Sequence, residues 1–505
     1  MKINFKLMTL LIPIAFFTHV ALATEDFSAI DRYVKSAKEE VGLPTGTAIA
    51  IVKNGKIIYE GYFGYADIKA NKKVNKNTAF YIASITKPMF ALSTLLMEEK
   101  GDIKDTSSMA DMFPDQNFPY INAEKIQLKH LMSCSAGIVN YPLLATLAYT
   151  GNHDVEQRYD LLANSTNNEK YQLGKFKYTN LGFNIASVWA ENYYKQDWQQ
   201  TIAELIYKPL GMSHTSSYMT DAAKQGFEVA RPYSLFSNNP REIYAFEKSN
   251  LNMHAAGGTI STAADLARFL IAQLNEGKVD GKQIFPAKVI KKSHQQLAVN
   301  DVMFDDFMRE GYAWGWNMGP YKGQEMYHHF GGVLGANTHS SYMLKHNIGL
   351  IILNNQAEIS DVLSNGIADI AYSILLNQGD ADEIADTRIT QMQKESTELK
   401  TRIQKSNQRT AKINASRVMM LSEAKSKYQG LFHNSLWGDL LIELLPTGEF
   451  NFTLGELSTV ASAYTEQDAM RVEFPSTRSG KVVTFDIVNN ETQGLKLFGE
   501  YFNKR

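Results

Sequence analysis

The chain has 505 residues, more than the roughly 100–200 of one typical domain, so two or more domains are expected. Its content of 44% hydrophobic and 11% aromatic residues is enough for a sizeable core and excludes a mainly disordered protein. The formal net charge of −2 gives no indication of a nucleic-acid-binding surface, and no nucleic-acid partner is expected.

The N-terminus has the layout of a secretory signal peptide. A short basic start precedes an uncharged apolar run from Leu7 to Val20, and the small residues Ala21 and Ala23 follow it. The run is shorter than the roughly 20 residues of a spanning helix, so an uncleaved membrane anchor is the weaker alternative. The sequence therefore predicts an exported protein, periplasmic or secreted, without an integral membrane segment once residues 1–23 are removed.

Cys134 is the single cysteine of the chain. An intramolecular disulfide is therefore excluded, and the core alone must stabilise the protein, even in an oxidising compartment. We expect Cys134 to be a buried structural thiol; a nucleophilic thiol is the alternative.

The first elements after the signal peptide are a predicted helix and a predicted hairpin. Residues 26–41 carry apolar side chains at the spacing of an amphipathic helix. Two β-rich runs, 47–52 and 57–62, flank Asn54-Gly55, which is the strongest short-range hairpin signal. An antiparallel sheet therefore starts near the N-terminus.

The middle of the chain is mostly helical in pattern. The periodic segment 83–100 ends at Gly101, a suitable helix C-cap. Another helix is predicted to open at Thr262, which has the spacing of a capping box with Asp265.

Strands are predicted again at 339–343 and 348–353, followed by a helix at 358–377. Strands at both ends of this region with helices between them predict a single sheet assembled from both ends. The predicted fold class is α+β: an antiparallel sheet flanked by helices, with an inserted helical subdomain.

The last part of the chain changes composition twice. Residues 380–429 contain neither Gly nor Pro and favour a long polar helix or helical linker. From Gly430, short alternating runs predict a small antiparallel, barrel-like β domain. Its predicted strands are 440–444, 450–454, 470–474, 482–487 and 495–502. The predicted parts are a signal peptide (1–23), an α+β domain (24–378), a helical linker (379–427) and a small β domain (428–505).

Ser84 and Lys87 form a Ser-x-x-Lys pattern at the start of a predicted helix. Residues three apart share a helix face, and the helix N-terminus favours the negative charge of an alkoxide or oxyanion. A serine becomes a good nucleophile when a base takes its proton, and a lysine serves as that base when burial or a cation lowers its pKa. A solvated helix start with an N-cap serine is the alternative.

Two further patterns carry polar groups at a spacing that suits a site. Tyr178 and Asn180 would face one side of an extended loop, where a tyrosinate could move a proton and an amide could bind substrate; a packed aromatic is the alternative. His329 and Gly331 would share one side of a strand; a structural histidine is the alternative. Neighbouring strand residues face opposite ways, so His328 and His329 do not predict a metal site, and no metal or cofactor is expected.

These three motifs, in this order, resemble the signature of the serine β-lactamase and penicillin-binding-protein superfamily, especially its class C β-lactamase branch. Further segments are similar to recurring stretches of that family. They are residues 127–137, 209–212 and 256–262. The resemblance spans roughly residues 26–378, and the segment 428–505 resembles the small β domains often appended to such hydrolases.

The resemblance implies a role for each matched residue. Ser84 would attack a carbonyl to form an acyl-enzyme, while Lys87 and Tyr178 share the general-base and general-acid roles. Asn180 would contact the substrate amide, and His329 and Gly331 would flank the acyl group. The backbone N–H groups of Ser84 and Gly332 would form the oxyanion hole.

The resemblance departs from the β-lactamase pattern at His329, where many members carry lysine. A histidine is mostly uncharged at neutral pH, which argues against efficient hydrolysis of carboxylate-bearing β-lactams. The expected function is an exported serine hydrolase of amide or ester bonds, β-lactamase-like or D-alanyl-D-alanine-peptidase-like, acting on a small-molecule or peptide substrate that includes peptidoglycan-derived ones. The alternatives are a carboxylesterase of the same family and a catalytically silent peptidoglycan- or peptide-binding protein.

Overall fold

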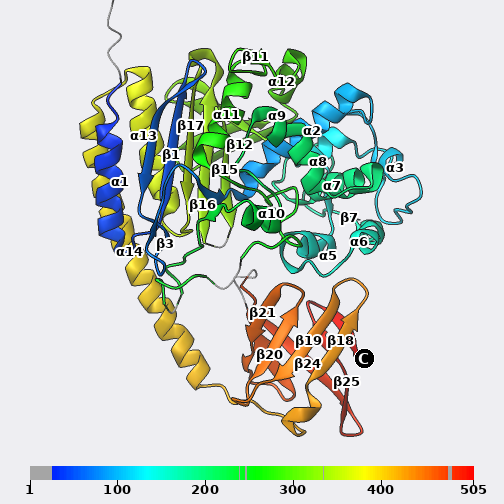
Figure 1. Ribbon diagram of the computed structural model, residues 1–505. Coiled ribbons are helices and arrows are strands. Elements are labelled where there is room, and N and C mark those ends of the chain that lie inside the picture. Colours follow the sequence, from blue (N-terminus) through cyan, green and yellow to red (C-terminus); the bar gives the residue numbers. More distant parts are fainter. Residues whose placement is uncertain (1–24, 238, 245–246, 334, 476–479) are drawn as a thin grey trace, which may run out of the picture.

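The computed structural model describes residues 25–237, 239–244, 247–333, 335–475 and 480–505. The predicted signal peptide lies outside these residues. Within them, no helix is both long and apolar enough to span a bilayer. Two sheets organise the molecule, a larger one flanked by helices and a smaller one at the C-terminus (Figure 1).

The larger sheet has eight antiparallel strands in the order β12-β13-β14-β15-β16-β17-β1-β2. Its strands are β1 Thr47–Lys53, β2 Lys56–Phe63, β12 Ala298–Phe304, β13 Phe307–Tyr312, β14 Asn317–Tyr321, β15 Gln324–Val333, β16 Ala336–Met343 and β17 Ile348–Asn354. Strand β1 pairs with β2 on one side and with β17 on the other. The predicted N-terminal hairpin and the sheet assembled from both ends of the sequence are therefore confirmed.

Both faces of the larger sheet are covered, and strands β1 and β17 are apolar on both sides. In β1, Ile49 and Ile51 join the core under α1 (Ser28–Val41) and α13 (Ser360–Leu376). The intervening residues Ala48, Ala50 and Val52 face the opposite core, which includes α11 (Ala263–Leu274). Figure 1 shows α1, α13 and α14 on one side of the sheet and the helical region on the other.

The predicted helical insertion lies between β5 and β12 and includes the first catalytic candidates. Its helices are α2 Thr86–Lys100, α3 Met109–Met112, α4 Leu128–Met132, α5 Tyr141–Ala145, α6 Val155–Leu161, α7 Leu181–Tyr194, α8 Trp198–Ile202, α9 Lys208–Leu210, α10 Met219–Lys224, α11 and α12 Ala287–Ser293. Short strands lie within this region and just before it. Those before it are β3 Tyr65–Asp67, β4 Lys72–Lys73 and β5 Thr78–Tyr81, and those within it are β6 Ile138–Val139, β7 Thr166–Asn167, β8 Glu228–Val229, β9 Ile260–Ser261, β10 Lys278–Val279 and β11 Lys282–Gln283.

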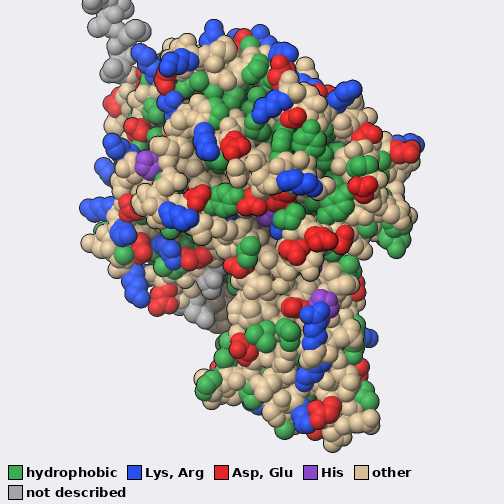
Figure 2. Space-filling model, turned by 45° about the vertical axis from the view of Figure 1, so that its right-hand side comes forward, with side chains coloured by type: hydrophobic (Ala, Val, Ile, Leu, Met, Phe, Trp, Pro, Cys, Tyr) green, Lys and Arg blue, Asp and Glu red, His purple; other side chains and the backbone are tan. Residues whose placement is uncertain are grey.

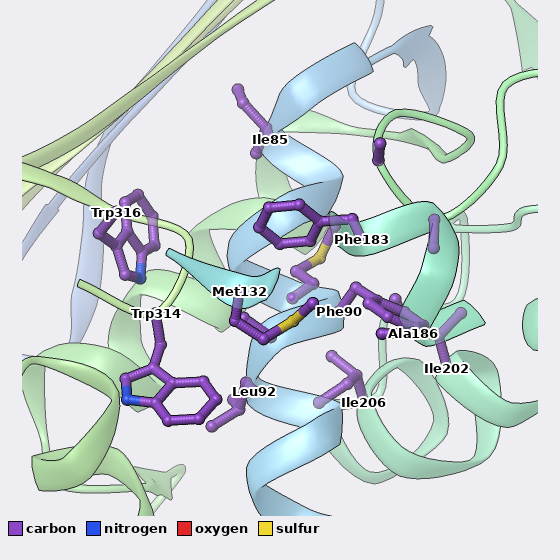
Figure 3. Close-up of a cluster of buried hydrophobic side chains, with 14 of the residues drawn as sticks. Ile85, Phe90, Leu92, Met132, Phe183, Ala186, Ile202, Ile206, Trp314 and Trp316 are labelled. Atoms are coloured by element: carbon purple, nitrogen blue, oxygen red, sulfur yellow. The ribbon is translucent and has the colours of Figure 1, made fainter. Parts of the chain in front are cut away.

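Helix α2 is the centre of the helical region. Every residue from Thr86 to Met97 is buried, as expected of a helix that is apolar on all sides. Figure 3 shows it between Trp314 and Trp316 on one side and Phe183 and Ile206 on the other. Its start is therefore held rigidly by the core.

The predicted long polar helix is confirmed as α14 (Ala381–Ala415), which ends before the predicted limit of the segment 380–429, and it is more than a spacer. Its first half packs on α1 and α13 and buries Ala385 and Met392. Arg388 forms ion pairs with Asp369 and Asp306 at 2.8 and 2.6 Å. The second half extends to the C-terminal sheet (Figure 1).

The C-terminal sheet has nine antiparallel strands in the order β21-β20-β19-β18-β26-β25-β24-β23-β22. They are β18 Gly430–Asn434, β19 Gly438–Leu444, β20 Phe450–Leu454, β21 Leu457–Val460, β22 Ser462–Ala463, β23 Ala469–Val472, β24 Lys481–Val488, β25 Glu491–Leu497 and β26 Glu500–Lys504. The two edge strands are consecutive in sequence, so the sheet is nearly closed and barrel-like, as predicted.

One strand prediction in this sheet is wrong. The run 495–502 is interrupted, because Phe498 (φ 56°) and Gly499 (φ 87°) take left-handed conformations and turn β25 into β26. Gly499 is the local sign of this turn, but the residues on both sides of it are typical of strands and Phe498 is an unusual residue for a left-handed conformation.

The C-terminal sheet forms a lobe below the larger body in Figure 2 and is fastened to it by specific contacts. Asn152 Nδ2 donates hydrogen bonds to the carbonyl oxygens of Trp437 (2.9 Å) and Asp439 (3.0 Å). The N–H of Glu456 donates to the Thr150 carbonyl at 2.8 Å. Met253 belongs to the hydrophobic core of this sheet, so the lobe packs against the helical region.

Candidate active site

Ser84 lies in a tight turn between β5 and α2. The preceding residue, Ala83, is buried and has a left-handed φ of 46°. That conformation costs a residue with a side chain about 1–2 kcal/mol and persists only where the surroundings enforce it. The turn redirects the chain sharply from the strand into the helix, which places Ser84 at the helix N-terminus.

The amine of Lys87 is fully buried and makes three hydrogen bonds. Nζ lies 3.0 Å from Ser84 Oγ, 2.7 Å from Asn180 Oδ1 and 2.8 Å from the carbonyl oxygen of Ala256. Burial lowers the pKa of Lys87 to about 7, so a large fraction of the side chain is a neutral amine at neutral pH.

The three partners of Lys87 define the direction of its lone pair. The amide oxygen of Asn180 and the carbonyl of Ala256 only accept hydrogen bonds. A neutral amine has two N–H donors, and these two acceptors use both. Its lone pair is then left for the hydroxyl proton of Ser84, which is the arrangement a general base requires.

Tyr178 lies beside this pair. Its ring centroid is 5.0 Å from Lys87 Nζ, and 41% of the residue is exposed. Desolvation of the hydroxyl raises the pKa of Tyr178 above its ordinary value, and a hydrogen bond with Ser84 opposes part of this rise. Tyr178 is therefore a neutral phenol at physiological pH, and of the two candidate bases Lys87 is the one with a suitable pKa.

His329 extends the aromatic wall of the site from β15. Its ring is 5.9 Å from that of Tyr178, and burial holds the pKa of His329 well below its usual range. Nδ1 lies 2.7 Å from the Phe330 carbonyl and must donate to it, so Nε2 is left to accept from the Tyr312 hydroxyl at 3.3 Å. His329 is a neutral imidazole with a fixed tautomer. The neighbouring His328 packs on Phe307 instead, as strand alternation predicts.

Gly331 and Gly332 bring β15 close to the serine turn. A Cβ on Gly331 would lie 2.2 Å from the Ile82 carbonyl oxygen, whereas a Cβ on Gly332 would meet nothing within 4 Å. The strand therefore lies directly against the turn that precedes Ser84, and the position of Gly332 is open.

A small cavity of about 60 Å³ opens beside Ser84. Three of the predicted residues line it, namely Ser84, Asn180 and Gly332. Lys87, Tyr178 and His329 stand behind or beside Ser84 and do not line it. The structure therefore gathers all seven candidate residues around one turn, although they are up to 248 positions apart in sequence (332 − 84).

Several residues of the site were not predicted from the sequence. Asn184 and His254 line the cavity, and the main-chain carbonyl of Ala256 contacts Lys87. Asn184 could have been found, because it follows Asn180 by one helical turn. His254 had no such signal. Ala256 opens the segment 256–262 that resembles the family, but its contact with Lys87 is made by a main-chain carbonyl that the sequence does not mark. Arg309 is a further cation near Tyr178, and burial lowers its pKa to about 10.

Cys134 agrees with the expected structural thiol. It is buried, its Sγ donates to the Thr179 carbonyl at 3.3 Å, and burial raises the pKa of the thiol. A thiol with a raised pKa is a poor nucleophile. Among the residues the structure describes, no three His, Cys, Asp or Glu side chains gather as metal ligands.

Comparison with known proteins places this site in a family context. The family model described as Beta-lactamase matches residues 30–371. Penicillin-binding protein 4* of Bacillus subtilis (strain 168) is 25% identical over 350 residues, 66% of this chain and 72% of the relative. PbpX of the same organism is 30% identical over 260 residues, 51% of this chain and 61% of PbpX, so the chain spans less than two thirds of that relative.

Solved structures share the fold at lower identity. The octameric penicillin-binding protein homologue from Pyrococcus abyssi has a TM-score of 0.60 at 19% identity, covering 95% of this chain and 100% of its own. The D-amino acid amidase from Ochrobactrum anthropi SV3 has a TM-score of 0.55 at 18% identity, covering 70% of this chain and 97% of its own. The family match covers more than half of the sequence, and the chain belongs to the β-lactamase family, within the superfamily of serine β-lactamases and penicillin-binding proteins.

Proposed function

We propose that this protein is an exported serine hydrolase that cleaves amide or ester bonds through an acyl-enzyme on Ser84. The observation that carries the proposal is the position of Lys87, whose buried Nζ lies within hydrogen-bond distance of Ser84 Oγ, Asn180 Oδ1 and the Ala256 carbonyl. In the neutral amine the two pure acceptors take both N–H groups, which leaves the lone pair for the hydroxyl proton of Ser84. A neutral, buried amine in this position is a competent general base at neutral pH.

The proposed reaction has two steps. In acylation, Ser84 Oγ forms a bond to the substrate carbonyl carbon while Lys87 takes the hydroxyl proton; the carbon–leaving-group bond then breaks and the leaving group takes a proton from Tyr178 or Lys87. In deacylation, water forms a bond to the ester carbon and gives a proton to neutral Lys87; the bond between that carbon and Ser84 Oγ then breaks, and Oγ takes the proton back from Lys87. The main-chain N–H groups of Ser84 and Gly332 stabilise the oxyanion in both steps, a contribution typically of about 3–4 kcal/mol per donor.

The proximity of β15 to the serine turn supports the assignment of the oxyanion hole. A side chain at Gly331 would push the strand away from Ile82, and Gly332 leaves room for the carbonyl oxygen. In this proposal Asn180 serves twice, since it orients Lys87 through Oδ1 and offers Nδ2 to the substrate amide.

The substrate class follows from the neutral His329. The uncharged imidazole offers no cation to a substrate carboxylate, and the guanidinium of the nearby Arg309 stacks on Phe304, so penicillins are expected to react slowly. A peptide or amide substrate, including peptidoglycan-derived peptides, is the first choice, and the fold shared with a D-amino acid amidase and with penicillin-binding proteins supports it. The same neutral site also favours the second candidate, an uncharged ester. The third candidate is a catalytically silent peptidoglycan- or peptide-binding protein, which would keep the fold and show no turnover.

The division of the chain is part of the proposal. We assign a signal peptide to 1–23, the hydrolase domain to 24–378, a helical linker to 379–427 and a small β domain to 428–505.

Intact-mass measurement tests the proposal directly. The protein is incubated with a fluorophosphonate and, separately, with a penicillin, and each sample is compared with Ser84→Ala. A covalent adduct of the fluorophosphonate on the wild type alone is the expected result. Absence of any adduct with both probes would falsify nucleophilic catalysis and favour a binding protein. Turnover of D-alanyl peptides, p-nitrophenyl esters and nitrocefin then ranks the substrate classes.

A further inference from the structure

Two residues that line the cavity beside Ser84 carry buried polar atoms without partners. Both amide atoms of Asn184 (1% exposed) and Nδ1 of His254 (3% exposed) have no hydrogen-bond partner among the described residues. Buried polar groups in folded proteins are almost always paired, so such a pair beside a candidate nucleophile needs an occupant.

The two residues are held in place by the backbone around them. Asn184 lies one turn after Asn180 on the same face of α7, so the residue that orients Lys87 and the residue that faces the cavity are on one rigid helix. The His254 N–H donates to the Leu147 carbonyl, and its own carbonyl accepts from Gly257 and Gly258, each at 2.8 Å. A site with this rigidity is suited to selective binding.

The charges around the cavity exclude two kinds of ligand. Burial and the neighbouring cations Arg158 and Lys248 hold the pKa of His254 well below its usual value, so the imidazole is neutral and the local field disfavours a second cation. Arg158 is paired with Glu191 at 3.1 Å and is not among the residues that line the cavity, so an anion finds no free countercharge there. The amide of Asn184 both donates and accepts.

We propose that Asn184 and His254 form a specificity subsite that takes a small, uncharged hydrogen-bonding group, a hydroxyl or a primary carboxamide, from the acyl part of the substrate. The inference rests on the proposed hydrolase function and adds the chemistry of the acyl group. Ser84 and Gly332 line the same cavity, so a group held there lies beside the carbonyl carbon that Ser84 attacks, and the proposal assigns it to the acyl part that stays bonded to Ser84. At about 60 Å³ it admits a few atoms only.

A matched pair of esters tests the subsite. The p-nitrophenyl esters of 3-hydroxybutanoate and 3-methylbutanoate differ only by a hydroxyl in place of a methyl group. We expect wild-type kcat/KM to favour the hydroxyl ester by about 10-fold or more, because the methyl ester leaves Asn184 and His254 unpaired. Asn184→Leu, which has a similar size, is expected to reduce this ratio to within about 3-fold, and His254→Gln is expected to reduce it in part.

The matched control is Ser187→Ala. Ser187 is buried on the same helix, and its hydroxyl is bonded to the carbonyl of Asn184 at 2.8 Å, outside the cavity lining. It should keep the wild-type ratio. Equal kcat/KM for the two esters in the wild type would overturn the subsite and indicate a resident water only, and so would an unchanged ratio in a folded Asn184→Leu. Fluorophosphonate labelling of the same wild-type sample separates the two claims: labelling without ester preference rejects the subsite alone, and no labelling rejects the hydrolase proposal.

Discussion

Lys87 Nζ and Asn180 Oδ1 are 2.7 Å apart, which is shorter than the 3.0 Å between the same amine and Ser84 Oγ. Asn180 is therefore a close neighbour of the base, and its amide is uncharged. A charged group in its place would act on the pKa of Lys87 at hydrogen-bond distance, where electrostatic effects on a buried amine are large.

Asn180→Asp is predicted to shift the acidic limb of the activity profile to higher pH. A carboxylate beside Lys87 favours the protonated ammonium and raises its pKa, and the active form is the neutral amine. In the wild type, kcat/KM should rise with pH around a midpoint of about 7. In Asn180→Asp this midpoint should lie at least about one pH unit higher. Asn180→Leu is the uncharged control: it should weaken activity without this upward shift. A profile of Asn180→Asp that keeps the wild-type midpoint would contradict the role of Lys87.

Gly331→Ala and Gly332→Ala are predicted to differ sharply in stability. A Cβ at Gly331 would lie 2.2 Å from Ile82 O and 2.3 Å from Thr338 Oγ1, so the strand or the serine turn must move. Overpacking of this kind costs about 1–3 kcal/mol of unfolding free energy. A Cβ at Gly332 meets nothing, and that variant should stay within about 0.5 kcal/mol of the wild type. Urea denaturation of both variants measures the difference, and equal stabilities would contradict the close approach of β15.

The larger part of the fold was predictable from the sequence because its signals are local. The hairpin around Asn54-Gly55 and the helix start at Thr262 both depend on neighbouring residues. At Thr262 the side chain caps the Asp265 N–H as predicted, but Asp265 turns its carboxylate to Thr215 and the His214 N–H instead of completing the capping box. Such long-range competition has no local signal.

The site was predictable where side chains carry the chemistry and not where the backbone does. Ser84, Lys87 and Asn180 stand in recognisable patterns, and the structure brings them together. The carbonyl of Ala256 is a main-chain group that any residue could supply, so no residue type marks it. The left-handed Ala83 is likewise invisible in the sequence, since alanine gives no indication of such a turn.

Acid is predicted to destabilise the protein through its buried histidines. Burial lowers the pKa of His339 to about 3, so the folded state keeps it neutral while the unfolded state takes up a proton below about pH 6.5. The contribution of neutral His339 to the free energy of unfolding is complete above pH 6.5. It is lost as the pH falls from 6.5 toward 3, by about 1.4 kcal/mol per pH unit. His339→Gln should flatten the pH dependence of the unfolding free energy by this amount between pH 6 and 5. An unchanged slope would show that His339 is already charged in the folded protein.

Asn152→Ala is predicted to loosen the C-terminal sheet from the larger body. The substitution removes the hydrogen bonds to Trp437 and Asp439, each worth about 1 kcal/mol, and leaves two carbonyl groups unpaired at the contact. Hydrogen exchange should increase at residues 437–439 more than at the centre of β19. Asn192→Ala, a surface substitution on α7, is the control and should leave this exchange unchanged. Equal exchange in Asn152→Ala and wild type would show that other contacts hold the sheet.

The pH dependence of Ser84 labelling tests the central claim, that a neutral Lys87 activates Ser84. The second-order rate constant for fluorophosphonate adduct formation is measured by intact mass from pH 5 to 9 in the wild type and in Lys87→Met. The wild-type rate should rise with pH around a midpoint of about 7, and Lys87→Met should label about 10²–10⁴-fold more slowly, without that midpoint. A wild-type rate that does not depend on pH, or a Lys87→Met rate equal to it, would contradict the mechanism.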